Sequence, residues 1–233
     1  MTPYAQVQLL SSATKEWSIT EILTYLTGQF PGQVSFSSSF GQEDQVLTDM
    51  IAQEGLEIKI FTLDTGRLFQ ETYDVFDRTK RKYDLDIQAY YPAAKELGEM
   101  VSQEGPNSFY FGIKERKKCC RIRKLEPLRR ALKGNKIWVT GLRSGQSANR
   151  QELPKFEYDE QFKVIKFNPL LDWELAAVQV YLEKYNVPQN SLHKKGFVSI
   201  GCAPCTRAIE PGDDIRAGRW WWEGSHKECG LHK

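Results

Sequence analysis

Apolar residues recur along the chain with two different spacings, and the two alternate. Short apolar runs typical of buried strands cover 33–38, 57–63, 86–91, 136–142 and 162–170. Spacings of three and four residues, typical of amphipathic helices, cover 17–30, 43–55, 68–83 and 172–185, and further helices are expected after Pro92 and over the basic segment 112–132. This alternation predicts an α/β fold built on a mostly parallel, doubly wound sheet.

Three of the predicted helices carry boundary signals. Ser18 and Glu21 have the spacing of a capping box, in which each side chain bonds the backbone N–H of the other residue. Asp172 is expected to cap the N-terminus of the last helix. Gly55 is expected to end the second helix, because glycine readily adopts the left-handed conformation that closes many helices.

The periodicity fades after about residue 186, where the chain becomes rich in Gly, Pro, Trp and Cys. We therefore expect one α/β domain over 1–190 and an irregular tail over 191–233 that packs on it. The longest apolar runs fall short of the roughly 18 residues that span a bilayer, and the first residues, "MTPYAQVQLL", lack the pattern of a signal peptide. A net charge of +2 and 40% hydrophobic residues suit a packed core, and we expect no membrane partner. The odd count of five cysteines favours a cytoplasmic location.

Polar residues follow three of the predicted strands, where open α/β sheets bind their ligands. Hydroxyls precede a helix start in "SFSSSFGQED", an Asp-Thr-Gly turn occurs in "LDTGRL", and arginines occur in "GLRSGQSANR". Taken singly, these loops also fit an ordinary serine-rich turn, a common turn and solvated arginines. Together they predict a site for a nucleotide or another anion; its candidate residues are Ser35, Ser37, Asp64, Thr65, Gly66, Gly141, Arg143, Gln146, Ser147 and Arg150.

The five cysteines are an odd count, which does not suit a secreted disulfide framework. Cys119 and Cys120 are adjacent in "KERKKCCRIRK", and Cys202 and Cys205 form a C-x-x-C pair. Four thiolates suit either zinc or an iron–sulfur cluster, although a tandem pair is not a zinc knuckle. A thioredoxin-like redox pair is the alternative, but such a pair normally lies inside a βαβ unit. We expect all four cysteines to ligate one metal centre.

Basic residues surround the tandem cysteines. Between Lys114 and Lys136 there are eleven Lys or Arg against Glu115 and Glu126. Such cations would stabilise a negatively charged cluster and attract an anionic substrate. A solvated helix face and a nucleic-acid patch are the alternatives. Because the whole chain is nearly neutral, we expect no nucleic-acid partner.

Cys229, in the terminal "ECGLHK", has no such partner cysteine. A lone cysteine is more often inert than catalytic. However, the nearby Lys227 would favour a reactive thiolate by lowering the thiol pKa. Both interpretations remain open from the residues alone.

The motifs resemble those of the assimilatory sulfonucleotide reductases, specifically the adenosine 5′-phosphosulfate (APS) reductases. The resemblance extends from about Ser35 to His232 and includes the stretches quoted above together with "SIGCAPC", "RAGRWW" and "ECGLH". It implies one [4Fe–4S] cluster per subunit, held by Cys119, Cys120, Cys202 and Cys205, with Cys229 as the nucleophile. It also implies that Lys124 lies between the cluster and the substrate, and that Arg143, Arg150, Arg216 and Arg219 neutralise phosphate and sulfate oxygens.

The family in turn resembles the PP-loop ATP pyrophosphatases, whose phosphate loop reads SGGxDS. This chain has Ser37-Ser38-Ser39-Phe40 instead, which speaks against ATP hydrolysis and suits one phosphate joined to sulfate. The implied reaction is the reduction of APS to sulfite and AMP through an S-sulfocysteine. Thioredoxin, or a glutaredoxin-like dithiol, would be the reductant, and relatives form homo-oligomers, so we expect one here.

Three other functions remain as alternatives. The nearest is reduction of 3′-phosphoadenosine 5′-phosphosulfate (PAPS), or of both nucleotides, although relatives strict for PAPS generally lack the four cluster cysteines. A PP-loop enzyme that transfers adenylyl groups or thiolates tRNA is disfavoured by the altered loop and by "ECGLH". The third is a non-catalytic zinc module that binds nucleic acid.

Overall fold

The computed structural model describes residues 1–146 and 153–224, and the chain divides into two compact units. Unit 1 comprises Met1–Thr62, Asp74–Gln88 and Leu132–Asn190; unit 2 comprises Leu63–Tyr73, Ala89–Ala131 and Ser191–Lys233. The segment that follows Asn190 therefore groups with two earlier stretches of the chain. Domains over 1–190 and 191–233 stay a prediction. Among the described residues, no helix is both long enough and apolar enough to cross a membrane.

A six-stranded sheet in the order β3-β2-β1-β4-β6-β5 organises the fold. Its strands are β1 Val34–Ser37, β2 Lys59–Leu63, β3 Ile87–Tyr90, β4 Ile137–Val139, β5 Phe156–Asp159 and β6 Val164–Phe167. The pairs β1–β2, β1–β4 and β4–β6 are parallel, whereas β5 pairs with β6 in antiparallel fashion. The predicted α/β class and the mostly parallel sheet are confirmed. The apolar pattern did not predict β5, because an edge strand exposed on one side carries a weaker signal.

Eight α-helices accompany the sheet in the part of the chain that the structure describes. They are α1 Pro3–Ala13, α2 Ile19–Gln29, α3 Gln42–Gln53, α4 Gln70–Tyr83, α5 Ala94–Glu104, α6 Ile113–Cys120, α7 Glu126–Leu132 and α8 Leu175–Lys184. Seven fall within the helical stretches expected from the periodicity. The eighth, α1, was missed; its signals are local ones, since Thr2 accepts a bond from the Ala5 N–H and Pro3 occupies the first turn.

Two of the three predicted helix boundaries are confirmed, and one was wrong. The capping box of α2 is present: Ser18 accepts from the Glu21 N–H, and the Glu21 carboxylate accepts from the Ser18 N–H at 2.7 Å. Gly55 follows α3 with φ +58°, as expected for a helix-closing glycine. The prediction for Asp172 was wrong, because the N-cap of α8 is Glu174. A turn closed by the Trp173 N–H on the Leu170 carbonyl comes first and delays the helix.

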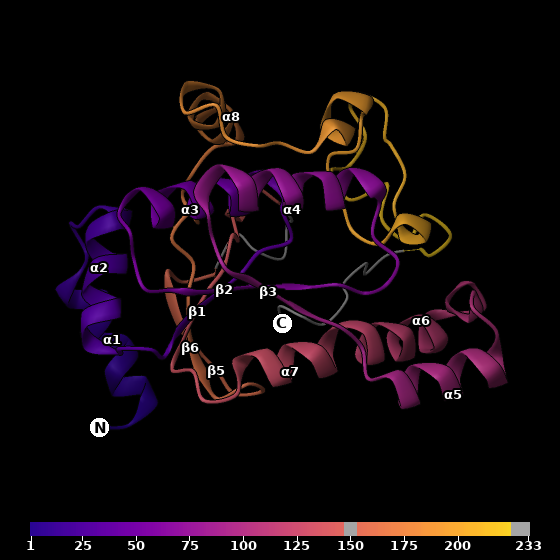
Figure 1. Ribbon diagram of the computed structural model, residues 1–233, viewed down its shortest axis with the longest axis horizontal. Helices are drawn as coiled ribbons and strands as arrows, with labels where there is room; N and C mark the ends of the chain where they lie inside the picture. The colour runs from indigo at the N-terminus through magenta and orange to yellow at the C-terminus, as the bar shows by residue number, and fades with distance from the viewer. Residues whose placement is uncertain (147–152, 225–233) are drawn as a thin grey trace. The chain divides into compact units, whose positions relative to one another are not determined.

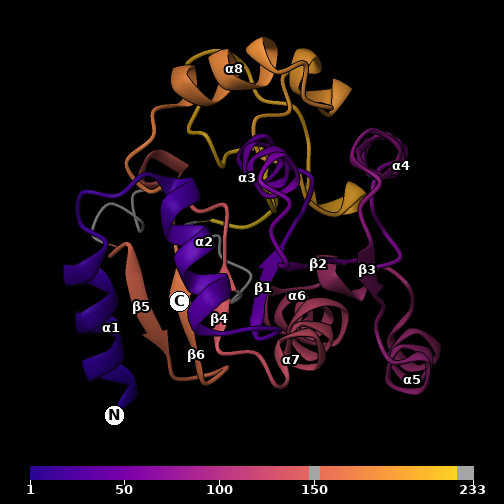
Figure 2. The ribbon, with the colours of Figure 1, turned by 60° about the vertical axis from the view of Figure 1, so that its left-hand side comes forward.

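Unit 1 is built around the buried faces of the sheet. Strand residues such as Phe36, Val139 and Phe167 are fully buried and belong to one apolar cluster with Leu47 of α3 and Val178 of α8. Helices α3 and α8 pack against each other, and α1 packs against β5, one of the two edge strands (Figure 2). The core thus holds the ends of β1 and β4, from which the predicted ligand loops emerge.

Unit 2 is mainly helical and irregular. Its α6 continues directly through a π-helical turn, Arg121–Leu125, into α7 (Figure 1). The turn is closed by the Glu126 N–H on the Arg121 carbonyl, and it begins immediately after Cys120. Single π turns inside helices occur often at functional sites, because they change the direction in which neighbouring side chains point. Cys119 and Cys120 are the last two residues of α6, and the π turn contains Arg123 and Lys124.

Candidate active site

The two serines nominated in β1 have different surroundings. Ser35 is buried in the middle of the strand, and its hydroxyl donates to the Ile137 carbonyl at 3.3 Å. Ser37 is the last residue of β1 and accepts a hydrogen bond from the indole N–H of Trp138 at 2.8 Å. Ser37 therefore lies at the ligand-binding end of the strand, whereas Ser35 lies within the sheet.

A buried carboxylate, Asp44, organises the loop after β1. It accepts hydrogen bonds from the Ser39 N–H at 2.6 Å and from the Ser39 hydroxyl at 2.7 Å. Burial raises the pKa of Asp44 to about 6, although the bonds from Ser39 oppose the shift. Gly141 lies against this carboxylate, and a Cβ at that position would overlap it. Gly141 is therefore required by close approach, which adds a physical reason to its nomination from the sequence.

The loop after β4 brings Arg143 to the same helix start. The Arg143 Nε lies 3.1 Å from a carboxylate oxygen of Glu43, and both side chains are largely buried. The Arg143 N–H also donates to the Gln146 side chain at 3.2 Å. Glu43 and Asp44 were not nominated from the sequence, although both lie within "SFSSSFGQED". Acidic residues in the first turn of a helix were the available signal, but that pattern also has a purely structural explanation.

The Asp-Thr-Gly turn belongs to unit 2 and contacts the cysteines there. Asp64 accepts from the Gly66 N–H at 2.8 Å and from the Tyr73 hydroxyl at 2.9 Å. Gly66 has φ +69°, a conformation that favours glycine. The Thr65 hydroxyl lies 3.3 Å from the Cys202 sulfur. This turn, weak as a signal by itself, is thus part of the cysteine site.

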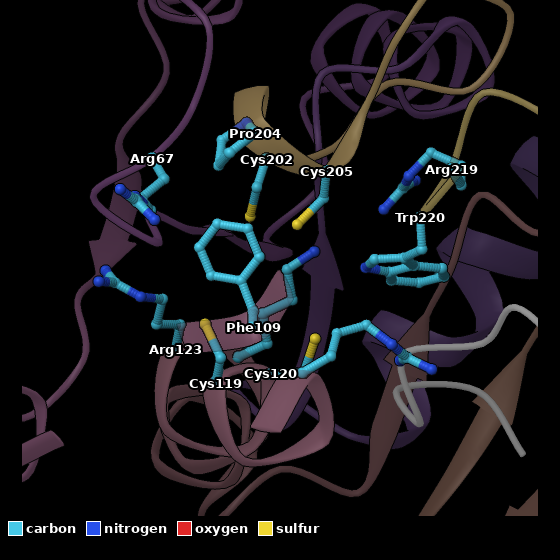
Figure 3. A pocket seen from close by; sticks show the side chains of 12 residues that line it. Arg67, Phe109, Cys119, Cys120, Arg123, Cys202, Pro204, Cys205, Arg219 and Trp220 are labelled. Atoms are coloured by element: carbon cyan, nitrogen blue, oxygen red, sulfur yellow. The ribbon is translucent and has the colours of Figure 1, made fainter. Parts of the chain in front are cut away.

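The cysteine site is a pocket within unit 2. Figure 3 shows the sulfurs of Cys119 and Cys120 facing those of Cys202 and Cys205 across it. Besides these four thiols, five of the described lining residues are cations, namely Arg67, Arg116, Arg123, Lys124 and Arg219. Among the described residues that line the pocket there is no Asp or Glu. The pocket is therefore lined by soft sulfur donors and positive charge.

The thiols differ in how readily they ionise. Burial acts to raise the pKa of Cys202, but Lys124 and the hydrogen bond from Thr65 outweigh it and lower that pKa. Burial, followed by the neighbouring cysteine sulfurs, raises the pKa of Cys205 to about 12. Burial also raises the pKa of Cys119. Four thiolates thus repel one another in this pocket unless additional positive charge lies among them.

This donor set is suited to a metal cluster, which stays a prediction. Four thiols from two distant segments line one buried pocket, and a bound metal would supply the charge that keeps them ionised. Among the described residues, no group of three or more His, Cys, Asp or Glu side chains is arranged to hold a metal ion. The residues that would hold a [4Fe–4S] cluster are Cys119, Cys120, Cys202 and Cys205.

A buried ion pair beside the pocket was not expected from the sequence. The Arg116 guanidinium donates to both carboxylate oxygens of Glu223, at 2.7 and 2.9 Å, and the two side chains are 1% and 4% exposed. Arg116 also lies over the Trp220 ring, 4.5 Å from its centre. Burial opposes the charge, but the Glu223 contacts prevail and raise the pKa of Arg116. The pair fixes the end of the described chain to α6.

Two nominated arginines lie near the same tryptophan. Arg219 and Arg216 lie 4.8 and 5.9 Å from the Trp220 ring centre. Arg219 lines the pocket and donates to the Ser199 hydroxyl at 3.3 Å. The structure thus brings Lys124 and Arg219 to the cysteine pocket. Ser147, Arg150 and Cys229 lie outside the described residues.

We expect Glu223→Gln to reduce the free energy of unfolding by about 3–5 kcal/mol, because it leaves the buried Arg116 charge without its partner. Arg116→Met combined with Glu223→Leu should recover most of that loss, since replacing both charges removes the unpaired one. Urea unfolding, followed at matched iron content, measures both effects.

The matched control is Asp77→Asn, which removes the partner of Arg81 from an exposed ion pair, 58% and 79% exposed. It should change the free energy of unfolding by less than about 1 kcal/mol. Equal effects at both sites would contradict a structural role for the buried pair.

Comparison with known proteins identifies the family. The profile of the phosphoadenosine phosphosulfate reductase domain matches residues 33–208. The chain belongs to this family. A protein of Allochromatium vinosum named adenosine 5′-phosphosulfate reductase is 48% identical over 221 residues, covering 94% of this chain and 86% of that protein. A protein of the same name from Neisseria meningitidis serogroup B is 51% identical over 200 residues, covering 85% and 81%. The family expected from the motifs is confirmed.

Solved structures of this family and of others share the fold. A phosphoadenylyl-sulfate (PAPS) reductase from Candida auris, crystallised as a phosphate complex, superposes with a TM-score of 0.74 at 28% identity, covering 87% of this chain and 96% of that one. Yeast FAD synthetase superposes with a TM-score of 0.57 at 18% identity, covering 89% and 69%. The second likeness shows the fold alone.

Proposed function

We propose that this reductase converts APS to sulfite and AMP with electrons from a dithiol protein such as thioredoxin. The observation that supports this most strongly is the meeting of four cysteines in one cationic pocket, in a chain whose relatives are named APS reductases. The cations of this pocket, apart from Arg116, which is paired with Glu223, would place positive charge beside the proposed cluster, and such surroundings suit a doubly anionic phosphosulfate.

The first step is a displacement at sulfur. The Cys229 thiolate attacks the sulfur of the phosphosulfate, a new S–S bond forms, and the bond from that sulfur to the bridging oxygen breaks. AMP leaves with the electron pair, and the enzyme carries S-sulfocysteine. Lys124, Arg143 and Arg219 are proposed to stabilise charge on the transferring and leaving oxygens. Arg150 and Arg216 are assigned the same role.

The second step uses the dithiol. One of its thiolates attacks the Cys229 sulfur, the S–S bond breaks, and sulfite leaves with the electron pair. The second thiol then resolves the mixed disulfide and regenerates the Cys229 thiolate. The dithiol is thereby oxidised to a disulfide by two electrons, which are the electrons gained by the sulfur of the substrate.

A [4Fe–4S] cluster bound to the four cysteines would supply a fixed charge and a covalent tie between α6 and the segment at 202–205. The residues around the pocket have their own tasks. Thr65 and Arg123 hold the strand turn against the site, because Arg123 donates to the Thr65 carbonyl at 2.6 Å. The chemistry of the proposed mechanism needs no change in the oxidation state of iron. Cytoplasmic location, thioredoxin as the reductant and a homo-oligomeric state are part of this proposal.

We expect APS to be preferred over PAPS, since relatives strict for PAPS generally lack the four cysteines that this chain has. Comparing kcat/KM for the two nucleotides with thioredoxin, in anaerobically purified protein, measures the preference. A higher kcat/KM for PAPS would instead support the PAPS reductase alternative. If neither APS nor PAPS yields sulfite, the proposed function is overturned.

A further inference from the structure

Trp138, which the mechanism above does not use, makes a specific contact with a nominated ligand residue. It is the central residue of β4, it is 1% exposed, and its indole N–H donates to the Ser37 hydroxyl oxygen at 2.8 Å. Ser37 lies at the end of β1, on the neighbouring strand. A tryptophan in a sheet is usually explained by packing alone, but this one has a directed bond to a residue at the ligand-binding edge.

The direction of this bond determines what Ser37 can do. A serine hydroxyl has one proton to donate and two lone pairs that accept. An indole N–H is a donor only, so the Ser37 oxygen must act as the acceptor toward Trp138. The hydroxyl proton is then directed to a different partner. Because anions accept hydrogen bonds, this orientation makes Ser37 a donor suited to a phosphate or sulfate oxygen.

Charged residues on the neighbouring strands β6 and β5 hold the Trp138 ring in place. Lys166 is paired with Trp138 in the β4–β6 register, and its ammonium lies 5.5 Å from the centre of the Trp138 ring. This lysine is 2% exposed and is bound by Glu157 at 2.9 Å and Asp159 at 3.4 Å. Phe162 packs against the Trp138 ring in an edge-on arrangement, with ring centres 5.7 Å apart.

Burying a lysine is costly unless its charge is compensated, so the two carboxylates determine where the Lys166 ammonium lies. The ammonium in turn favours one orientation of the Trp138 ring, because a cation is attracted to the face of an indole. The indole N–H is thus fixed before any ligand binds. Such preorganisation reduces the entropy that ligand binding would otherwise lose.

We propose that Trp138 is a positioning residue that orients the Ser37 hydroxyl as a hydrogen-bond donor to the phosphosulfate group or phosphate of the bound nucleotide. The inference rests on the proposed function, because it takes a sulfonucleotide or its AMP product as the ligand. The inference adds a residue that the sequence motifs did not nominate, since the Trp138 N–H is directed at Ser37 and not at the ligand.

Trp138→Phe tests this, because it keeps an aromatic ring in the core and removes the indole N–H together with part of the ring, and the double-mutant cycle below separates the two effects. We expect the Kd for AMP, measured by calorimetry, and the KM for APS to rise about three- to tenfold, the range that one net hydrogen bond supports. The kcat should change by less than about twofold, since ground-state binding is what weakens. Trp173→Phe, the same change at a partly buried tryptophan of unit 1, is the control and should leave Kd unchanged.

A double-mutant cycle separates positioning from packing. If Trp138 acts through the Ser37 hydroxyl, adding Trp138→Phe to Ser37→Ala should change Kd no further. Additive effects, or an unchanged Kd in Trp138→Phe, would overturn the inference. If the wild-type protein binds AMP but forms no sulfite from APS, the proposed function fails while the cycle still decides the role of Trp138. If it binds neither nucleotide, both proposals fail.

Discussion

Cys229→Ser is expected to lower sulfite formation by at least about a thousandfold, because a serine hydroxyl at neutral pH is a far weaker nucleophile than a thiolate. The variant should keep its iron and its affinity for AMP, since neither depends on this thiol in the proposed mechanism. Single-turnover assays with APS and thioredoxin measure the loss, and iron analysis and calorimetry measure what is retained.

The proposed intermediate gives a second readout for the same residue. Wild-type protein incubated with APS and no thioredoxin should gain one SO₃ group, roughly 80 Da, as expected of a covalent enzyme intermediate. Peptide mapping should place the group on the segment "ECGLHK", and Cys229→Ser should gain none. An adduct on Cys202 or Cys205, or substantial turnover by the serine variant, would reassign the nucleophile.

Cys202→Ser is expected to reduce the iron content from about four atoms per chain, the stoichiometry of a [4Fe–4S] cluster, to nearly none. Serine oxygen is a poor substitute for a thiolate toward iron, and Cys202 is the cysteine whose sulfur also contacts Thr65. Anaerobically purified wild-type protein should be brown, and the variant should be colourless and less stable to urea.

Cys229→Ser is the matched control for this change, because the proposed function assigns this cysteine to the nucleophile and not to the four cluster ligands. It should retain both colour and iron. Colourless wild-type protein that contains one zinc and is fully active would contradict the cluster and support the zinc alternative.

Features whose physical cause is local could be predicted from the sequence. The capping box of α2 joins residues only three positions apart, so the spacing of Ser18 and Glu21 was sufficient. Alternating strand and helix patterns predicted the sheet. Burial of one helix face gives apolar residues three and four positions apart, and burial of a whole strand gives a short apolar run. The prediction for Asp172 failed although its cause is also local: a turn closed by the Trp173 N–H on the Leu170 carbonyl precedes α8, and the N-cap is Glu174.

The candidate site follows the same division. The cysteines and the strand-end loops could be nominated because their residue types are suited to metal and anion chemistry. The sequence could not identify the residues that support these cysteines and loops. Arg116 and Glu223 are 107 positions apart, and Trp138 and Ser37 are 101 apart. In both cases one partner has many possible contacts, and no spacing rule selects the one that forms.

By itself, the sequence determined the α/β class, most of the helices and strands, and the family, because periodicity and short motifs depend on neighbouring residues. Only the tertiary structure decided which five cations line the pocket with the four thiols, that Gly141 lies against the Asp44 carboxylate, and that the Trp138 indole donates to Ser37. These arrangements arise when segments far apart in the chain are buried together. Burial makes each unpaired charge or donor costly, so the partner is selected by the packing of the whole unit rather than by the local sequence.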